Sequence, residues 1–234
     1  MIPETMVERF KACVMAAQDG SSHLSDDSSW VERLGSFIEA IPPCKGPALV
    51  VGPGAGYECR LLQRRGYEVH AVDIEPKVTE HHIRMRGEGV HILNNVPMEN
   101  MPYGPGEFGI VSSHHCLEHS LAPLAALCEW NRVLRVGGFL ALGVPPVSTA
   151  SAVALHICNF SRPLVAYLLA ATGFDVRRGL QFSQDYDECF IVRKVADPLQ
   201  TMQLRDLVPL LPEGMYREYP NGNCELADTF GGCG

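Results

Sequence analysis

Long apolar runs are missing from this sequence of 234 residues. The two longest nearly continuous stretches, residues 139–147 and 164–171, are too short to cross a bilayer. An excess of positive charge is missing as well, because 19 Lys and Arg stand against 27 Asp and Glu and no Lys/Arg-rich stripe offsets the net charge of −8. We therefore expect no membrane span and no binding of nucleic acid through its phosphates.

Paired cysteines are also absent. The nine cysteines include no C-x-x-C pair, and their number is odd. This pattern favours reduced thiols over a disulfide framework or a cysteine zinc site. The first residues lack the basic, apolar, small-residue order of a secretory signal. We expect a cytoplasmic protein.

The most informative stretch that is present runs from Pro47 to Asp73. Its valine-rich opening, residues 48–51, predicts a buried strand, and a helical pattern follows. A second apolar strand then ends in Asp73. Between the first strand and the helix, glycine occupies three alternate positions, Gly52, Gly54 and Gly56.

This order is typical of half of a nucleotide-binding crevice. Glycines allow positive φ angles and let a ligand lie directly against the backbone. The carboxylate of Asp73 can accept hydrogen bonds from a ribose diol. The dinucleotide fingerprint G-x-G-x-x-G would need glycine at position 57, where this sequence has Tyr57.

Helical and strand patterns alternate along the rest of the chain. His81 and His82 lie within one expected helix, where we expect them to be solvated surface residues. The expected helices are residues 3–18, 30–40, 76–86, 122–134 and 162–172. The expected later strands are residues 90–93, 108–113, 139–144, 174–182 and 188–195, the last two forming an antiparallel hairpin.

These elements predict a doubly wound, Rossmann-like α/β fold. Its sheet is mostly parallel and seven-stranded, with an antiparallel C-terminal hairpin strand and helices on both faces. We expect three parts: N-terminal helices in residues 1–46 that form a lid or simply pack on the core, the core in residues 47–196, and a C-terminal appendage in residues 197–234 that frays at its end.

Five motifs together resemble those of class I S-adenosylmethionine-dependent methyltransferases. The closest resemblance is to the type 11 group, which includes the ubiquinone and menaquinone methyltransferase-like proteins, and it covers Pro47 to Val195. It implies transfer of a methyl group from S-adenosylmethionine, leaving S-adenosylhomocysteine, to an oxygen or nitrogen atom of a small-molecule acceptor. The motifs, in chain order, are VVGPGAG, AVDIEP, the Met-Pro-Tyr step at 101–103, SSHHCLEHS and RVLRVGGFLALGVPP.

The resemblance implies a set of cofactor contacts. The glycine turn surrounds the methionine portion and the ribose, an acid binds the ribose hydroxyls, two apolar residues meet the adenine, and the end of the fourth strand holds the amino group through backbone carbonyls. In this sequence the matching residues are Gly52, Gly54, Gly56, Asp73, Ile74, Met98, and Ser113 or His114.

Two positions depart from the pattern of the family. Val50 stands where the family usually has an acid, which removes one polar anchor for the amino group. Pro97 stands where an acid usually holds the adenine amine, and Glu99 or Asn100 would have to substitute for it.

Three histidines follow the fourth expected strand, so we expect them to face the crevice. His115 or His119 is our candidate general base for an acceptor hydroxyl or amine. Alternatively, His115, Glu118 and His119, which would share one face of a helix, bind a divalent ion. A third reading is that the segment is a structural turn before the next helix. A zinc-protease interpretation of H-x-x-E-H is excluded, because the motif follows a buried strand within a methyltransferase-like order of motifs.

Two other functions remain open at this point. A catalytically degenerate module that binds S-adenosylmethionine, or that regulates a partner, fits the departures at Val50 and Pro97. A nicotinamide-dependent dehydrogenase fits the crevice, but Tyr57 and the later motifs oppose it. A nucleic-acid acceptor is opposed by the negative charge and by the absence of an N-P-P-[YFW] signature. The sequence leaves the oligomeric state open, a homodimer included.

Overall fold

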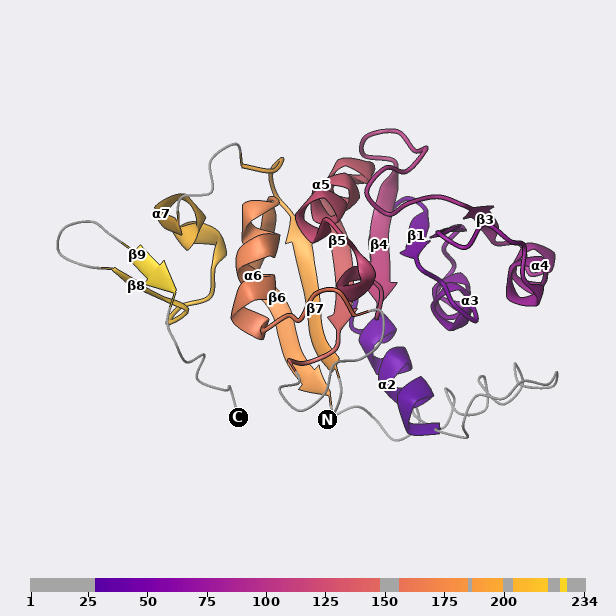
Figure 1. Ribbon diagram of the computed structural model, residues 1–234, viewed down its shortest axis with the longest axis horizontal. Coiled ribbons are helices and arrows are strands. Elements are labelled where there is room, and N and C mark those ends of the chain that lie inside the picture. The colour runs from indigo at the N-terminus through magenta and orange to yellow at the C-terminus, as the bar shows by residue number, and fades with distance from the viewer. Residues whose placement is uncertain (1–27, 148–155, 185–186, 200–203, 219–223, 227–234) are drawn as a thin grey trace.

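The computed structural model describes residues 28–147, 156–184, 187–199, 204–218 and 224–226 (Figure 1). The helix expected in residues 3–18 lies outside these ranges.

A seven-stranded sheet with the order β3-β2-β1-β4-β5-β7-β6 forms the centre of the molecule (Figure 1). The first five strands are parallel, whereas β7 runs antiparallel to both β5 and β6. The expected fold class is confirmed. The strands are β1 (Ala48–Val51), β2 (Val69–Asp73), β3 (His91–Asn94), β4 (Phe108–His114), β5 (Leu134–Val144), β6 (Phe174–Gln184) and β7 (Asp187–Lys194).

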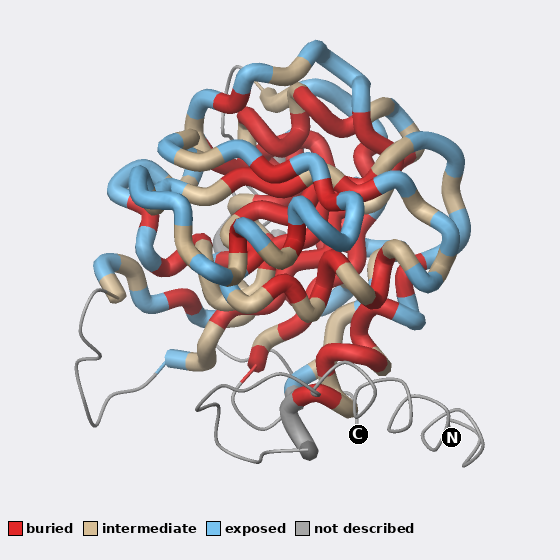
Figure 2. Tube along the Cα trace, turned by 90° about the vertical axis from the view of Figure 1, so that its right-hand side faces the viewer, coloured by how far each residue is buried: buried red, intermediate tan, exposed pale blue. Residues whose placement is uncertain are grey.

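Helices cover both faces of the sheet, and buried residues occupy its middle (Figure 2). Strand β1 shows why, because its four residues are all buried and alternate between the two faces. Leu49 and Val51 belong to the apolar cluster of α5 and α6, and Val50 to that of α2, α3 and α4. These helices are α2 (Ser28–Glu39), α3 (Tyr57–Arg64), α4 (Glu80–Gly87), α5 (Pro123–Val133) and α6 (Arg162–Ala171).

Helix α2 packs as the apolar spacing of the sequence predicts. Leu34, Phe37, Ile38 and Ile41 are all almost completely buried in one cluster with α3. The guanidinium of Arg65 ties the end of α2 to the end of α3 by donating to the carbonyls of Ile38 and Ile41. Helix α2 is therefore part of the core, and it lies beside the carboxyl end of β4 (Figure 1).

Two element boundaries differ from the expectation by more than two residues. Helix α4 begins at Glu80 because the side chain of Thr79 caps it by accepting from the amide of His82. Strand β5 begins at Leu134 rather than at residue 139. Its Gly137 has a φ of 82°, and the register between β4 and β5 shifts there, so residues 134–138 form an irregular first part of the same strand.

The described part of the C-terminal appendage packs on the core. Leu207, Leu211 and Met215 are fully buried in the cluster that contains α6. Its elements are α7 (Leu204–Leu207), the 3-10 helix η2 (Val208–Leu210), and the two-stranded β8 (Tyr216–Glu218) and β9 (Cys224–Leu226). Across the described ranges, no helix combines the length and apolarity that a membrane span requires.

Candidate active site

The glycine turn between β1 and α3 uses the conformational freedom of its three glycines. Gly52, Gly54 and Gly56 have φ angles of 71°, 51° and 81°, which favour glycine at each position. Gly56 is also the N-cap residue of α3, so the first amide groups of this helix face the end of the sheet. A turn of this kind can hold a polar ligand against the backbone.

Gly52 lies directly against the segment that follows β4. A Cβ atom at this position would come within 2.5 Å of the Sγ atom of Cys116. Burial raises the pKa of the Cys116 thiol to about 12. Cys116 is therefore a packing residue that brings the end of β4 next to the glycine turn.

The carboxylate of Asp73 stands at the end of β2 in a defined orientation. Its Oδ1 accepts from the amide of Glu75 at 2.9 Å, and its Oδ2 lies 3.2 Å from Nε2 of His82. His82 is almost completely buried, so our expectation of a solvated His81–His82 pair is wrong for His82. The ring also accepts from the amide of Thr79, which fixes its position.

The two apolar residues expected near an adenine, Ile74 and Met98, lie in the segments that follow β2 and β3. Ile74 follows Asp73 and is 62% exposed. Met98 packs partly buried against the core, and its carbonyl accepts from the indole of Trp130. The loop that carries Met98 is held to β2, because the amide of Val96 donates to the carbonyl of Asp73.

The last two residues of β4, Ser113 and His114, have different surroundings. The Ser113 hydroxyl is buried and donates to the carbonyl of Val51, so only its backbone can meet a ligand. The ring of His114 packs so closely on Gly143 that a Cβ atom there would lie 2.0 Å from it. The ring of Phe37 from α2 lies 5.8 Å away, between centroids. His114 is thus enclosed between β5 and α2.

His115 is paired with an acid from another strand. Its Nε2 forms a short hydrogen bond with Oδ1 of Asp187, the first residue of β7, while Nε2 of His114 lies 3.6 Å from Oδ2. Burial alone would lower the pKa of His115, but Asp187 and the charge of Glu118 raise it above its ordinary value. Burial alone would raise the pKa of Asp187, but its hydrogen bonds with both histidines lower it well below its usual range.

The H-x-x-E-H residues do not share one face of a helix, so that expectation is wrong. His115 has a φ of 51°, and the 3-10 helix η1 begins only at Leu117 and ends at His119. The left-handed residue turns the chain, which separates the histidines into two groups. His115 lies with Asp187, whereas His119 lies with Glu118 and His156.

Another carboxylate, that of Glu58, lies near the position in β1 where the acid is missing. Val50 is fully buried and pairs with Ser112 of β4. The hydroxyl of Ser112 donates to Oε1 of Glu58, from the first turn of α3, at 2.6 Å. Burial raises the pKa of Glu58, and the charges of His114 and His115 oppose this. Glu99, in contrast, accepts from the hydroxyl of Ser120.

Sequence reasoning missed three residues of this site: Glu58, His82 and Asp187. Glu58 and His82 carry weak signals, since each lies within a helix that follows an expected ligand-binding position. Asp187 has no local signal, because the turn between two antiparallel strands is usually rich in polar residues. Asp187 lies 72 positions from His115 in the sequence, and only the folding of the sheet brings the two side chains together.

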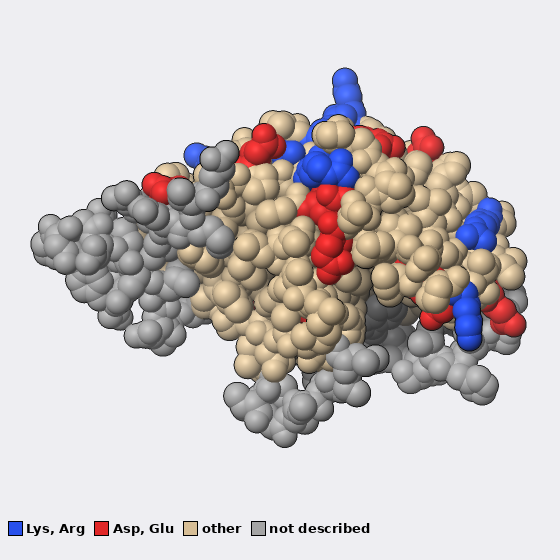
Figure 3. All heavy atoms as spheres, turned by 45° about the horizontal axis from the view of Figure 1, so that its top comes forward, with Lys and Arg blue, Asp and Glu red and all other residues tan. Residues whose placement is uncertain are grey.

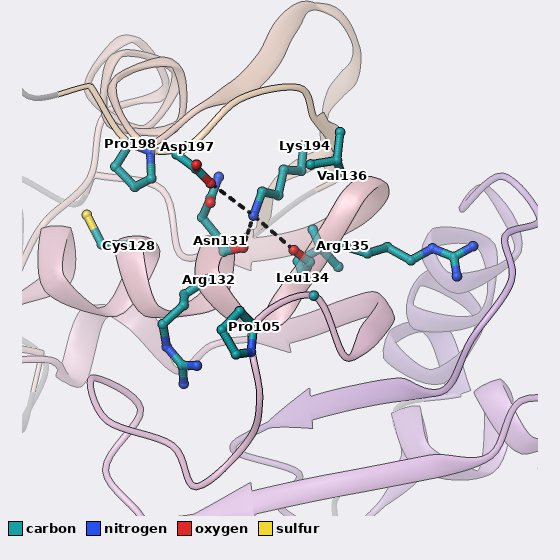
Figure 4. A pocket seen from close by; sticks show the side chains of 11 residues that line it. Pro105, Cys128, Asn131, Arg132, Leu134, Arg135, Val136, Lys194, Asp197 and Pro198 are labelled. Atoms are coloured by element: carbon teal, nitrogen blue, oxygen red, sulfur yellow. Dashed lines mark hydrogen bonds and ion pairs between the residues drawn. The ribbon is translucent and has the colours of Figure 1, made fainter.

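A hollow of about 510 Å³ lies at the opposite edge of the sheet and belongs to no part of this site (Figure 4). Lys194, at the end of β7, donates to the carbonyls of Asn131 and Leu134 and faces Asp197 at 3.5 Å. The other residues that line the hollow include Pro105 and Arg135, near the amino ends of β4 and β5.

Comparison with protein families decides what kind of domain holds this site. Residues 49–142 match the type 11 model described as "Methyltransferase domain". The chain carries a methyltransferase domain. The matched residues include the glycine turn, Asp73, and the segment from His114 to His119. No curated protein matched the sequence of the chain.

Solved structures show the same fold at low sequence identity. One is the *Burkholderia thailandensis* 1,6-didemethyltoxoflavin-N1-methyltransferase with bound 1,6-didemethyltoxoflavin and S-adenosylhomocysteine, with a TM-score of 0.61 and 18% identity over 84% of this chain and 92% of that one. Another is the *Haemonchus contortus* phosphoethanolamine N-methyltransferase 2 in complex with S-adenosyl-L-methionine, with a TM-score of 0.59 and 15% identity over 70% and 52%. The CurJ carbon methyltransferase has a TM-score of 0.56 and 13% identity over 73% and 56%.

The expectation of a class I methyltransferase is confirmed by the domain match and by the strand order. A methyltransferase domain of this fold takes its methyl group from S-adenosylmethionine, as the sequence predicted. The similar structures include enzymes named for transfer to nitrogen and to carbon, so the acceptor atom has to be argued from the site itself.

Proposed function

We propose that this methyltransferase moves the methyl group to an oxygen or nitrogen atom of a small-molecule acceptor. The observation that carries the proposal is the pairing of His115 with Asp187 just after the carboxyl end of β4. An acceptor hydroxyl or amine loses a proton when it is methylated, and a histidine held by a carboxylate is suited to take that proton.

Each residue of the site would have its own role in the reaction. Because Asp187 is hydrogen-bonded to Nε2 of His115, Nδ1 is the ring nitrogen that accepts the proton. The carboxylate of Asp187 stabilises the charged ring. S-adenosylmethionine supplies the reactive methyl group when bound, and the protein supplies orientation.

The glycine turn and Asp73 are suited to orient the cofactor at the carboxyl ends of β1 and β2. Phe37 of α2 and Gly143 of β5 enclose the ring of His114 beside it. Of the two expected roles of α2, a lid and simple packing on the core, these contacts support packing at this end of the sheet. His119, our second predicted base, stays a prediction.

A small-molecule acceptor is supported by the distribution of charge. The chain has a net charge of −8. On the face shown in Figure 3, Lys and Arg lie among Asp and Glu, and most of the surface carries neither. A phosphate backbone would need a continuous basic surface, which this face does not offer.

A reducing compartment such as the cytoplasm is our proposal for its location. Each of the six cysteines whose side chains the structure describes is a free thiol. Fractionation of cells that make the tagged protein tests this, and recovery from an oxidising compartment would contradict it.

Methyl transfer can be tested with the purified chain, S-adenosylmethionine and a panel of phenols, catechols and amines. We expect S-adenosylhomocysteine to form with at least one of them. His115→Gln should lower the rate about 100-fold or more while the affinity for the cofactor is kept. An unchanged rate in that variant, or product methylated only at carbon, would contradict the proposal.

A further inference from the structure

The carboxylate of Glu118 is buried without a hydrogen bond in the described residues. Its side chain has no exposed surface, and neither of its oxygens has a hydrogen-bond partner in the part of the chain that the structure describes. An ionised carboxylate that has left water normally keeps a cation or several donors close by. We therefore expect a positively charged group to bind beside Glu118.

Imidazole nitrogens surround this carboxylate at distances just beyond hydrogen bonding. Oε1 of Glu118 lies 3.9 Å from Nε2 of His119 and 4.0 Å from Nε2 of His156. Ligand atoms that share one ion at bonds of 2.0–2.1 Å lie roughly 3.3 Å apart. Small side-chain rotations would bring these three atoms to that spacing.

The backbone holds the two sides of this cluster together. The amides of Ile157 and Cys158 donate to the carbonyl of Glu118 at 2.9 and 3.1 Å. His156, which directly precedes them, is thereby kept beside η1, although it comes from the segment after β5. The rings of His119 and His156 meet at 78°, with 5.0 Å between centroids.

Two other groups of ligand-type side chains in the described residues fit an ion less well. In one, Glu68 lies 3.4 Å from both His70 and His91, and the carboxylate is largely exposed to water. In the other, Asp187 already pairs with His115. Only the Glu118 group contains a buried carboxylate whose oxygens have no hydrogen bond.

We propose that Glu118, His119 and His156 form a binding site for one divalent transition-metal ion of the zinc type. Two imidazoles and a carboxylate suit zinc, cobalt or manganese better than magnesium or calcium. The side chains of His119 and His156 are 40% and 17% exposed, so an ion can enter from solvent. Three protein ligands leave a coordination position open for water or another oxygen. The site does not depend on the proposed acceptor.

The test uses the full chain, stripped with a chelator and titrated with Zn²⁺ in a calorimeter. We expect one ion per chain, and an intense visible spectrum typical of tetrahedral coordination when Co²⁺ replaces Zn²⁺. Glu118→Gln and His156→Ala should each weaken Zn²⁺ binding by more than the roughly 10- to 100-fold that losing an outer-shell partner costs. His91→Ala, from the exposed group, is the matched control and should bind as the original chain does.

Several results would overturn this site. One is an original chain that binds no Zn²⁺, and another is loss of binding in His91→Ala but not in His156→Ala. Retained S-adenosylmethionine binding in His156→Ala shows that this variant is folded. If His156→Ala does not fold, the Co²⁺ spectrum of the original chain decides whether the metal site exists. Zinc binding without methyl transfer to any hydroxyl or amine would contradict the proposed function and leave this site in place.

Discussion

The hydroxyl of Ser112 donates a 2.6 Å hydrogen bond to the carboxylate of Glu58 inside the protein. Ser112 pairs in the sheet with Val50, which replaces the acid expected in β1. Glu58 therefore brings a carboxyl group from α3 to the neighbourhood of the position where β1 lacks one.

Glu58→Gln should weaken the binding of S-adenosylmethionine about 10-fold, because the amide keeps the shape but cannot ionise to pair with an ammonium group. Calorimetric titration measures this change. Glu39→Gln, an exposed acid at the end of α2, removes the same charge and should leave the affinity unchanged. Equal affinities for the original chain and Glu58→Gln would show that Glu58 serves packing alone.

His82→Ala should lower both the free energy of unfolding and the affinity for the cofactor. The buried ring holds Asp73 and caps α4 together with Thr79. Removing such a buried polar partner costs about 1–3 kcal/mol. Urea unfolding and cofactor titration measure the two effects. His81→Ala, the neighbouring residue, is the control. A cofactor affinity that stays unchanged in His82→Ala would contradict the role of His82 in orienting Asp73.

Gly52→Ala should destabilise the fold more than Gly54→Ala does. A Cβ at Gly52 meets Cys116 at 2.5 Å, whereas at Gly54 it meets nothing within 4 Å. Both positions have positive φ, so the strain common to both cancels. We expect Gly52→Ala to unfold more easily than Gly54→Ala by about 1–3 kcal/mol, the typical cost of overpacking. Urea unfolding measures the difference, and equal stability would contradict the close contact.

Asp187→Asn should lower kcat about 100-fold, because the amide no longer stabilises a protonated His115. The affinity for S-adenosylmethionine should change little, since β4 and β5 lie between β7, which carries Asp187, and β1 with its glycine turn. Asp197→Asn, at the other edge of the sheet, is the control. Steady-state kinetics with an accepted substrate measures the effect. A loss confined to cofactor affinity would speak against a role in proton transfer.

Glu129 should contribute a pH-dependent part of the stability. Burial opposes ionisation, but hydrogen bonds from Arg132 and from the amide of Met101 lower the pKa of Glu129 below its ordinary value of 4.5. A carboxylate with a lowered pKa stabilises the fold above its unfolded value, and this stabilisation is lost as the pH falls through the folded value. The stability advantage over Glu129→Gln should thus be constant above pH 4.5 and shrink below it. Urea unfolding across this range measures it, and an advantage that grows with acid would contradict the argument.

Much of the fold and the cofactor crevice follows from the sequence, because those features depend on near neighbours. The valine-rich β1, the glycines at alternate positions and Asp73 at the next strand end lie within one short stretch. Their pattern specifies a strand, a turn with positive φ and a helix start without help from distant residues. Apolar residues at helical spacing likewise account for the burial of Leu34 and Phe37 in α2.

The surroundings of the histidines were decided only by the tertiary structure. The left-handed conformation of His115 breaks the helix that H-x-x-E-H would otherwise form, and the sheet then brings Asp187 to it from β7. In the same way, Glu58 reaches Ser112 and His156 reaches Glu118 across the fold. Contacts between residues so far apart leave no periodic signal in a single sequence, because they arise from how the strands are ordered and how the segments between them return to the sheet edge.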